Sequence, residues 1–191
     1  MGKYDSILKH YPDFPIPGID FIDIMPLLQN REAFKSIVHD IADVLTCPNV
    51  ATVEARGFLF AAPLLTETDK VENVIAIRKK GKLPFSGDDL HDVPITKEYG
   101  KDHVYYRLSD IAAGVPDGDI MYVSIIDDIL ATGGTARGIA EAINKEKVTV
   151  GGKTYQVKVK EFIFIVELAT EIPGASEMLS QVAPVKSIIK V

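Results

Sequence analysis

Three features that the chain lacks narrow its function. It has one cysteine, Cys47, among 191 residues, so it cannot form an internal disulfide. We therefore expect a cytoplasmic protein, because the cytoplasm keeps thiols reduced. Positive charge is scarce as well, since 21 Lys and Arg face 27 Asp and Glu. A net charge of −6 argues against a general nucleic-acid-binding protein, which needs a basic face.

Long apolar runs are also missing. No run approaches the length of about 18 residues that marks a membrane helix, and the N-terminus lacks the apolar core of a signal peptide. We expect neither membrane association nor secretion. The composition, 47% apolar and 25% charged, is ordinary for a globular protein, and the length suits one domain with a sizeable core.

Short β-branched apolar runs alternate with helical patterns along the chain. The predicted strands cover residues 50–53, 74–77, 120–126, 162–166 and 185–189. Apolar spacing predicts helices over residues 31–46, 58–65 and 137–144. The alternation indicates an α/β fold with a mainly parallel central sheet flanked by helices. Ligands of such folds bind beyond the carboxyl ends of the strands.

Two further segments have a composition of their own. Residues 148–160 alternate apolar and polar side chains about Gly151-Gly152, which predicts an edge hairpin without catalytic chemistry. Residues 82–101 are polar, punctuated by Gly and Pro, and without a clear period. That composition is typical of a flexible lid loop over a ligand.

The stretch from Met121 to Arg137 says most about function. An apolar run ends in Asp127 and Asp128, and a loop of small and hydroxyl residues then leads into a helical pattern. Free backbone N–H groups at a helix N-terminus, with glycines that allow close approach, outline a phosphate site. With a phosphate in the loop, the two aspartates would meet sugar hydroxyls or a bound Mg²⁺. The ligand indicated is a sugar phosphate.

Two common phosphate motifs do not fit this loop. It lacks the Gly-Lys-Ser/Thr ending of the Walker type, and its glycines do not have the dinucleotide spacing. The segment instead resembles the phosphoribosyl-pyrophosphate (PRPP) motif of type I phosphoribosyltransferases. This resemblance implies that Asp127 and Asp128 hold the ribose 2′- and 3′-hydroxyls. It also implies a 5′-phosphate loop of Ala131, Thr132, Gly133, Gly134 and Thr135.

Four further segments, in order, resemble the adenine phosphoribosyltransferase branch of that superfamily. They are residues 12–28, 54–60, 78–84 and 98–100, and the likeness resumes at 162–189. The resemblance implies a single domain over residues 1–191 with the type I phosphoribosyltransferase fold. A hood segment over residues 1–30 would bind the base. The implied reaction converts adenine and PRPP to AMP and pyrophosphate with Mg²⁺, in a homodimer.

The same resemblance assigns the pyrophosphate side of the site. Glu54, Ala55 and Arg56 look like the family's pyrophosphate loop, in which a cis peptide aims backbone N–H groups at the leaving group. The basic segment that follows the next strand would add Arg78, Lys79 and Lys82. Mg²⁺ would be bound mainly through PRPP, with Asp127 and Asp128 as candidate ligands.

On the base side, the resemblance places Glu98 near N7 of adenine and Tyr99 near the reacting sugar. Together with Arg56, these are the candidate catalytic residues. Phe21 would stack on the purine, and the backbone around Asp20 would read its edge.

The chain departs from the family pattern only on the base side and the lid. Asp20 and Ile22 stand where the family usually has an apolar and a basic residue. Ile95-Thr96-Lys97 precedes Glu98 where Tyr-Ser-Leu is usual, and we expect the acidic tract 88–92 to lie in solvent at the lid tip. The resemblance therefore constrains the identity of the base less than it constrains the reaction class.

Two alternatives stay open at this point. One is a phosphoribosyltransferase for hypoxanthine or guanine, although such enzymes typically have Glu-Asp before the loop, where this chain has Asp-Asp. The other is a PRPP-sensing regulator without turnover. Regulators of this fold usually add a DNA-binding domain, whereas few residues precede Pro12, and Glu98 with the basic segment favours catalysis.

Overall fold

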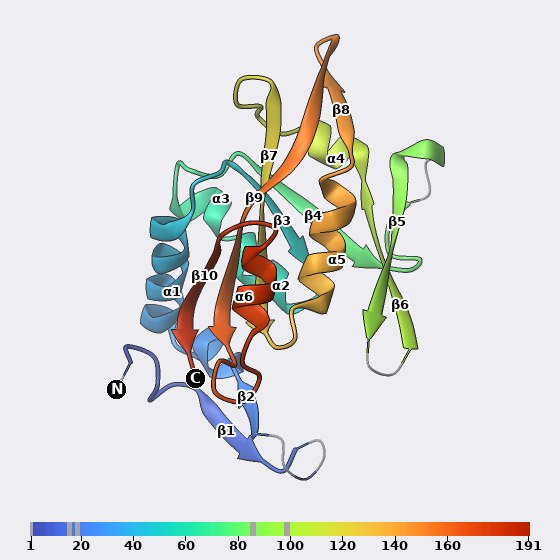
Figure 1. Ribbon diagram of the computed structural model, residues 1–191. Helices are drawn as coiled ribbons and strands as arrows, with labels where there is room; N and C mark the ends of the chain where they lie inside the picture. The colour runs from blue at the N-terminus through green and yellow to red at the C-terminus, as the bar shows by residue number, and fades with distance from the viewer. Residues whose placement is uncertain (1, 15–16, 18–19, 85–86, 98–99) are drawn as a thin grey trace.

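A computed structural model describes residues 2–14, 17, 20–84, 87–97 and 100–191 (Figure 1). Its centre is an eight-stranded sheet with the order β10-β9-β7-β3-β4-β6-β5, and β8 pairs with β9. Strands β1 (Lys9–Pro12) and β2 (Asp20–Asp23) form a separate antiparallel pair below this sheet in Figure 1. The predicted α/β fold with a mainly parallel sheet is confirmed.

The neighbours β10-β9-β7-β3-β4 run parallel, and β6, β5 and β8 are antiparallel additions. The parallel strands are β3 (Asn49–Val53), β4 (Asn73–Lys79), β7 (Ile120–Leu130), β9 (Lys153–Glu167) and β10 (Val185–Lys190). The antiparallel ones are β5 (Leu90–Lys97), β6 (Gly100–Arg107) and β8 (Lys147–Val150).

Helices cover both faces of the sheet and bury a separate apolar cluster on each. One cluster includes α1 (Arg31–Val44), α2 (Arg56–Ala61) and α3 (Leu64–Glu67). The other includes α4 (Leu108–Ala112), α5 (Gly134–Ile143) and α6 (Ala175–Ser180). Short 3-10 helices cover Met25–Gln29 and Gly87–Asp89. Within the described ranges, no helix is long and apolar enough to cross a membrane.

Several boundaries differ from those expected. The strand expected over 120–126 continues to Leu130, because β9 runs alongside it and pairs Ile129 with Val166. The helix expected over 58–65 is two short helices that meet at Pro63, which has no N–H to donate. The hairpin turn at Gly151-Gly152 is present, with both glycines at positive φ, and its second arm continues into the core as β9.

The segment proposed as a lid is more regular than its composition suggested. Residues 90–97 form β5, and Val93 and Ile95 are 3% and 1% exposed within the apolar core. Alternate side chains of this strand face the core, so the expectation of an aperiodic segment is wrong here. The sequence pattern did not reveal this strand, because only Val93 and Ile95 are buried. Pro94 lies between them, and charged residues lie nearby.

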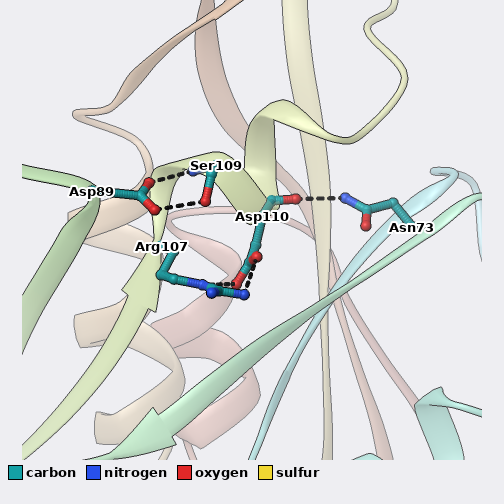
Figure 2. A network of polar contacts seen from close by, with 5 residues as sticks. All are labelled: Asn73, Asp89, Arg107, Ser109 and Asp110. Atoms are coloured by element: carbon teal, nitrogen blue, oxygen red, sulfur yellow. Dashed lines mark hydrogen bonds and ion pairs between the residues drawn. The ribbon is translucent and has the colours of Figure 1, made fainter. Parts of the chain in front are cut away.

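The acidic tract is tied to the body of the protein, contrary to the expectation that it lies in solvent. The Asp89 carboxylate accepts hydrogen bonds from the backbone N–H and the hydroxyl of Ser109, both at 2.6 Å (Figure 2). Ser109 lies in the first turn of α4, so Asp89 caps that helix from another segment. Arg107 and Asp110 form an ion pair at 2.7 Å beside it.

Removing this cap should weaken the fold. We expect Asp89→Ala to lower the free energy of unfolding by about 1 kcal/mol, the usual cost of losing an N-cap. Urea denaturation followed by far-UV circular dichroism would measure it. Asp88→Ala, at the exposed neighbouring acid, is the matched control and should change stability little. Equal losses in the two variants would show that the Asp89–Ser109 contact does not hold the helix.

Candidate active site

The carboxyl ends of β3, β4 and β7 meet around a polar cavity of about 310 Å³. Parallel neighbours end at the same edge of a sheet, so residues far apart in sequence come together there. The cavity brings together seven of the residues predicted from sequence: Glu54, Ala55, Arg56, Lys79, Asp127, Asp128 and Thr135. The lining is completed by Val53 of β3, Ile95 of β5, and Asp102 and Val104 of β6, which sequence reasoning had not singled out for the site.

Asp127 and Asp128 form a compact acidic pair on the wall of this cavity. The Asp127 Oδ1 accepts a hydrogen bond from the Asp128 N–H at 2.9 Å, and Arg56 Nε lies 2.5 Å from Asp128 Oδ2. Burial and the adjacent Asp128 charge raise the pKa of Asp127, although the Asp128 N–H and Arg56 oppose the rise. A cation or a set of hydroxyl donors at this point would relieve the repulsion.

A close backbone approach fixes the position of this pair. A Cβ on Gly57 would lie 2.5 Å from Thr52 Oγ1 and 3.0 Å from Asp127 Oδ1. Only glycine therefore lets the start of α2 pack against β3 and β7. The preceding Glu54–Ala55 peptide is cis, as the resemblance implied.

Arg78 contacts a residue of the cavity wall. Its Nε is 2.7 Å from Glu54 Oε2. Burial alone would raise the pKa of Glu54, but the hydrogen bonds from Arg78 and from the backbone of Lys79 outweigh it and hold the pKa below its usual value. Arg78 also donates a hydrogen bond to the backbone carbonyl of Lys82, and Lys82 itself is exposed. Neither Arg78 nor Lys82 lines the cavity.

The loop between β7 and α5 leads directly into the N-terminus of a helix. Gly133 has a φ of 76°, which favours glycine, and α5 begins at the next residue. A Cβ on Gly133 would lie 2.9 Å from Met178 Cε of α6, so α6 packs directly against the loop. The first N–H groups of α5 have no partner within the helix and can bind an anion.

A second cavity, of about 440 Å³, lies between the hood and the sheet. Asp20, Phe21 and Ile22 of β2 line one side, and Ile129, Leu168 and Ile172 provide apolar surface on the other, next to Glu171. Sequence reasoning missed this second set. The alternation of side chains along β7 could have indicated Ile129, because it follows the aspartate pair on the same strand.

The remaining predicted residues are Glu98 and Tyr99, which lie outside the described residues. In the described part of the chain, no three His, Cys, Asp or Glu side chains gather as a metal site. Two adjacent carboxylates on a cavity wall nevertheless suit Mg²⁺, which proteins often bind through one or two carboxylates together with substrate phosphates. The donor set fits a metal that arrives with a phosphorylated ligand.

No protein-family model matches this chain, but known adenine phosphoribosyltransferases are similar to it in sequence and in structure. The adenine phosphoribosyltransferase of Maridesulfovibrio salexigens is 36% identical over 174 residues, which cover 90% of each chain. The crystal structure of the Thermoanaerobacter pseudethanolicus adenine phosphoribosyltransferase superposes with a TM-score of 0.76 at 31% identity, over 97% of this chain and 96% of that one.

The yeast enzyme, solved with an imino-altritol bisphosphate and adenine, gives a TM-score of 0.71 at 28% identity, over 96% of this chain and 94% of that chain. The likeness thus extends through the hood, the sheet and the closing strands. This chain belongs to the adenine phosphoribosyltransferase family.

Proposed function

We propose that the protein transfers the phosphoribosyl group of PRPP to adenine, forming AMP and pyrophosphate. The observation that carries this proposal is the pair of cavities beside the end of β7. One is polar and includes the aspartate pair, Arg56 and Lys79, while the other is largely apolar and includes Phe21. Such a pair of sites suits a substrate with a charged sugar phosphate at one end and a flat base at the other.

The reaction needs the two substrates to meet at the sugar. The lone pair of adenine N9 forms a bond to C1′, the electrons of the C1′–O bond leave with pyrophosphate, and the N9 proton is released. Positive charge develops on the ribose as the bond breaks, so nearby carboxylates stabilise it. In this proposal Asp127 and Asp128 bind the ribose hydroxyls, and Ala131–Thr135 bind the 5′-phosphate.

The leaving pyrophosphate requires cationic and N–H partners. The backbone around the cis Glu54–Ala55 peptide, Arg56 and Lys79 fill this role in the proposal, since all of them line the polar cavity. Arg78 acts one step back, by holding the Glu54 carboxylate. Mg²⁺ would neutralise the charge of the pyrophosphate, with Asp127 and Asp128 as its candidate protein ligands.

We also propose that residues 82–101 form a lid that covers the bound substrates. In this proposal Glu98 hydrogen-bonds N7 of adenine and Tyr99 lies near the sugar. Exclusion of water matters here, because water competes with the base for the activated C1′. The buried side chains of Val93 and Ile95 anchor part of this segment in the apolar core. A cytoplasmic location likewise stays a prediction.

The first prediction concerns the products. Purified protein with PRPP and Mg²⁺ should form AMP and pyrophosphate from adenine, and adenine should have the highest kcat/KM among the common purine bases. Chromatography of the nucleotide products, with each base in turn, measures this. A tenfold preference for hypoxanthine or guanine, roughly 1.4 kcal/mol, would contradict the choice of base. Tight PRPP binding without turnover of any base would point to a regulator.

The second prediction separates the acids by role. Asp127→Asn or Asp128→Asn should weaken PRPP binding and lower turnover, because the charge near ribose and Mg²⁺ is lost. Glu98→Gln should lower kcat but leave PRPP affinity nearly unchanged, since Glu98 is proposed to contact only the base. Calorimetric titration with PRPP and steady-state kinetics test this division. Equal losses of PRPP affinity in all three variants would refute it.

The third prediction follows from the raised pKa of Asp127. The folded state binds this proton more tightly than the unfolded chain does, so Asp127 destabilises the fold as the pH rises above the usual carboxyl pKa of about 4. Asp127→Asn keeps an oxygen that can accept the Asp128 N–H. We expect the variant to be more stable than the parent at neutral pH, with the advantage lost below about pH 4. Urea denaturation at both pH values is the measurement.

We also propose that the active form is a homodimer, with an interface near residues 54–60 and 78–84. Leu59 supports this proposal, because this large apolar residue is 39% exposed and lies on α2, the helix that begins at Arg56. An interface there could bring basic residues of one subunit toward the pyrophosphate site of the other.

Leu59→Asp should therefore shift the protein toward a monomer in light scattering and lower its activity at low concentration. Leu65→Asp, at an exposed leucine of α3 outside the two segments, is the control and should stay dimeric. A parent enzyme that is monomeric and fully active at low concentration would rule the dimer out.

A further inference from the structure

The two strands of the hood carry a polar pair. His10 of β1 and Asp20 of β2 are joined through Nδ1 and Oδ2 at 2.6 Å. The register of the two strands explains the contact, since Pro12 pairs with Asp20 and His10 pairs with Ile22. Both side chains therefore lie on the same face of the antiparallel pair. His10 restrains one oxygen of the carboxylate and sets the direction of the other.

The second oxygen has no such partner. Asp20 Oδ1 is buried and makes no hydrogen bond to any described residue. Asp20 also lines the cavity between hood and sheet, beside the apolar side chains of Ile22, Ile129 and Leu168. A buried oxygen without a donor is unfavourable and is uncommon in folded proteins. The arrangement is consistent with a donor that arrives with a ligand.

We propose that Asp20 Oδ1 accepts a hydrogen bond from the exocyclic amino group of the purine, and that His10 is the residue that positions Asp20. This inference rests on the proposed function and adds a specificity determinant to it. A carboxylate oxygen accepts and does not donate, so it favours a 6-amino group. A 6-oxo group would bring a second acceptor against it. The pair thereby selects adenine over hypoxanthine and guanine.

The direct test is Asp20→Asn, assayed with adenine and with hypoxanthine at saturating PRPP. The asparagine amide has nearly the same shape but can turn its NH₂ toward a 6-oxo group. We expect kcat/KM for adenine to fall by about tenfold or more, as when a buried donor loses its acceptor. The adenine-to-hypoxanthine ratio of kcat/KM should fall by at least as much. The KM for PRPP should not change.

A matched control lies on the same strand. The substitution Asp23→Asn removes the same charge. The Asp23 carboxylate, however, accepts a hydrogen bond from the backbone N–H of Met25, and Asp23 does not line this cavity. The ratio of kcat/KM values should stay at the parent value in this variant. A similar fall in both variants would show that the loss of one negative charge in the hood, and not the Asp20 contact, sets the preference.

The role of His10 has its own readout. His10→Ala should raise the KM for adenine several-fold with a smaller effect on kcat, because the carboxylate is no longer held. His10→Asn places an amide N–H near the position of Nδ1 and should restore the parent KM. A purely structural role would alter the melting temperature and affect both substrates alike. Should Asp20→Asn fail to fold, the His10 variants decide the question, because they leave the cavity wall unchanged.

The outcomes separate this inference from the function on which it rests. If the parent protein forms no AMP from adenine and PRPP, the proposed function fails. If the parent is active with adenine but folded Asp20→Asn keeps the parent ratio, only the Asp20 assignment is overturned. The full proposal is supported if the ratio falls in Asp20→Asn and is unchanged in Asp23→Asn, and if the KM for adenine rises in His10→Ala and returns to the parent value in His10→Asn.

Discussion

Two adjacent carboxylates held at the end of a buried strand are the constraint on which the rest of the site depends. Asp127 and Asp128 lie on β7, between β3 and β9, where water cannot fully solvate both charges. Arg56 offsets part of the repulsion through Asp128, and the Asp128 N–H offsets part of it at Asp127. The raised pKa of Asp127 measures what remains. A ligand that brings hydroxyl donors and a divalent cation removes a cost that the free protein carries.

The geometry around this pair follows from close packing of backbone. Gly57 lets α2 approach β7, and this places Arg56 beside Asp128. Gly133 plays the corresponding part on the other side, where α6 packs against the loop that opens α5. Side chains at either glycine would displace the elements that define the cavity. The site is thus built from small residues at its edges as much as from charged residues at its centre.

β7 also borders two unlike environments. The aspartates contribute to the polar cavity, and Ile129, the next residue, contributes to the cavity beneath the hood. Asp127 and strand β2 of the hood are more than 100 residues apart in sequence, yet the two cavities share this boundary. A substrate joined at C1′ would bridge the two environments at this point. The hood therefore depends on the same strand as the phosphate loop, although its own two strands are separate from the main sheet.

The sequence alone determined the α/β class, the parallel strands and the loop that opens α5, because each has a local signature: a β-branched run, a helical stripe, or a glycine-rich turn after two acids. It also predicted that a ligand binds beyond the carboxyl ends of the parallel strands. Tertiary structure decided what local pattern cannot express. Pairing with β9 extended β7 to Leu130, and burial of Val93 and Ile95 turned part of a polar segment into a core strand. Asp89 acquired a partner in Ser109, and Arg78 in Glu54. These contacts form between residues that only folding brings together. The spacing of residues within one segment therefore cannot predict them.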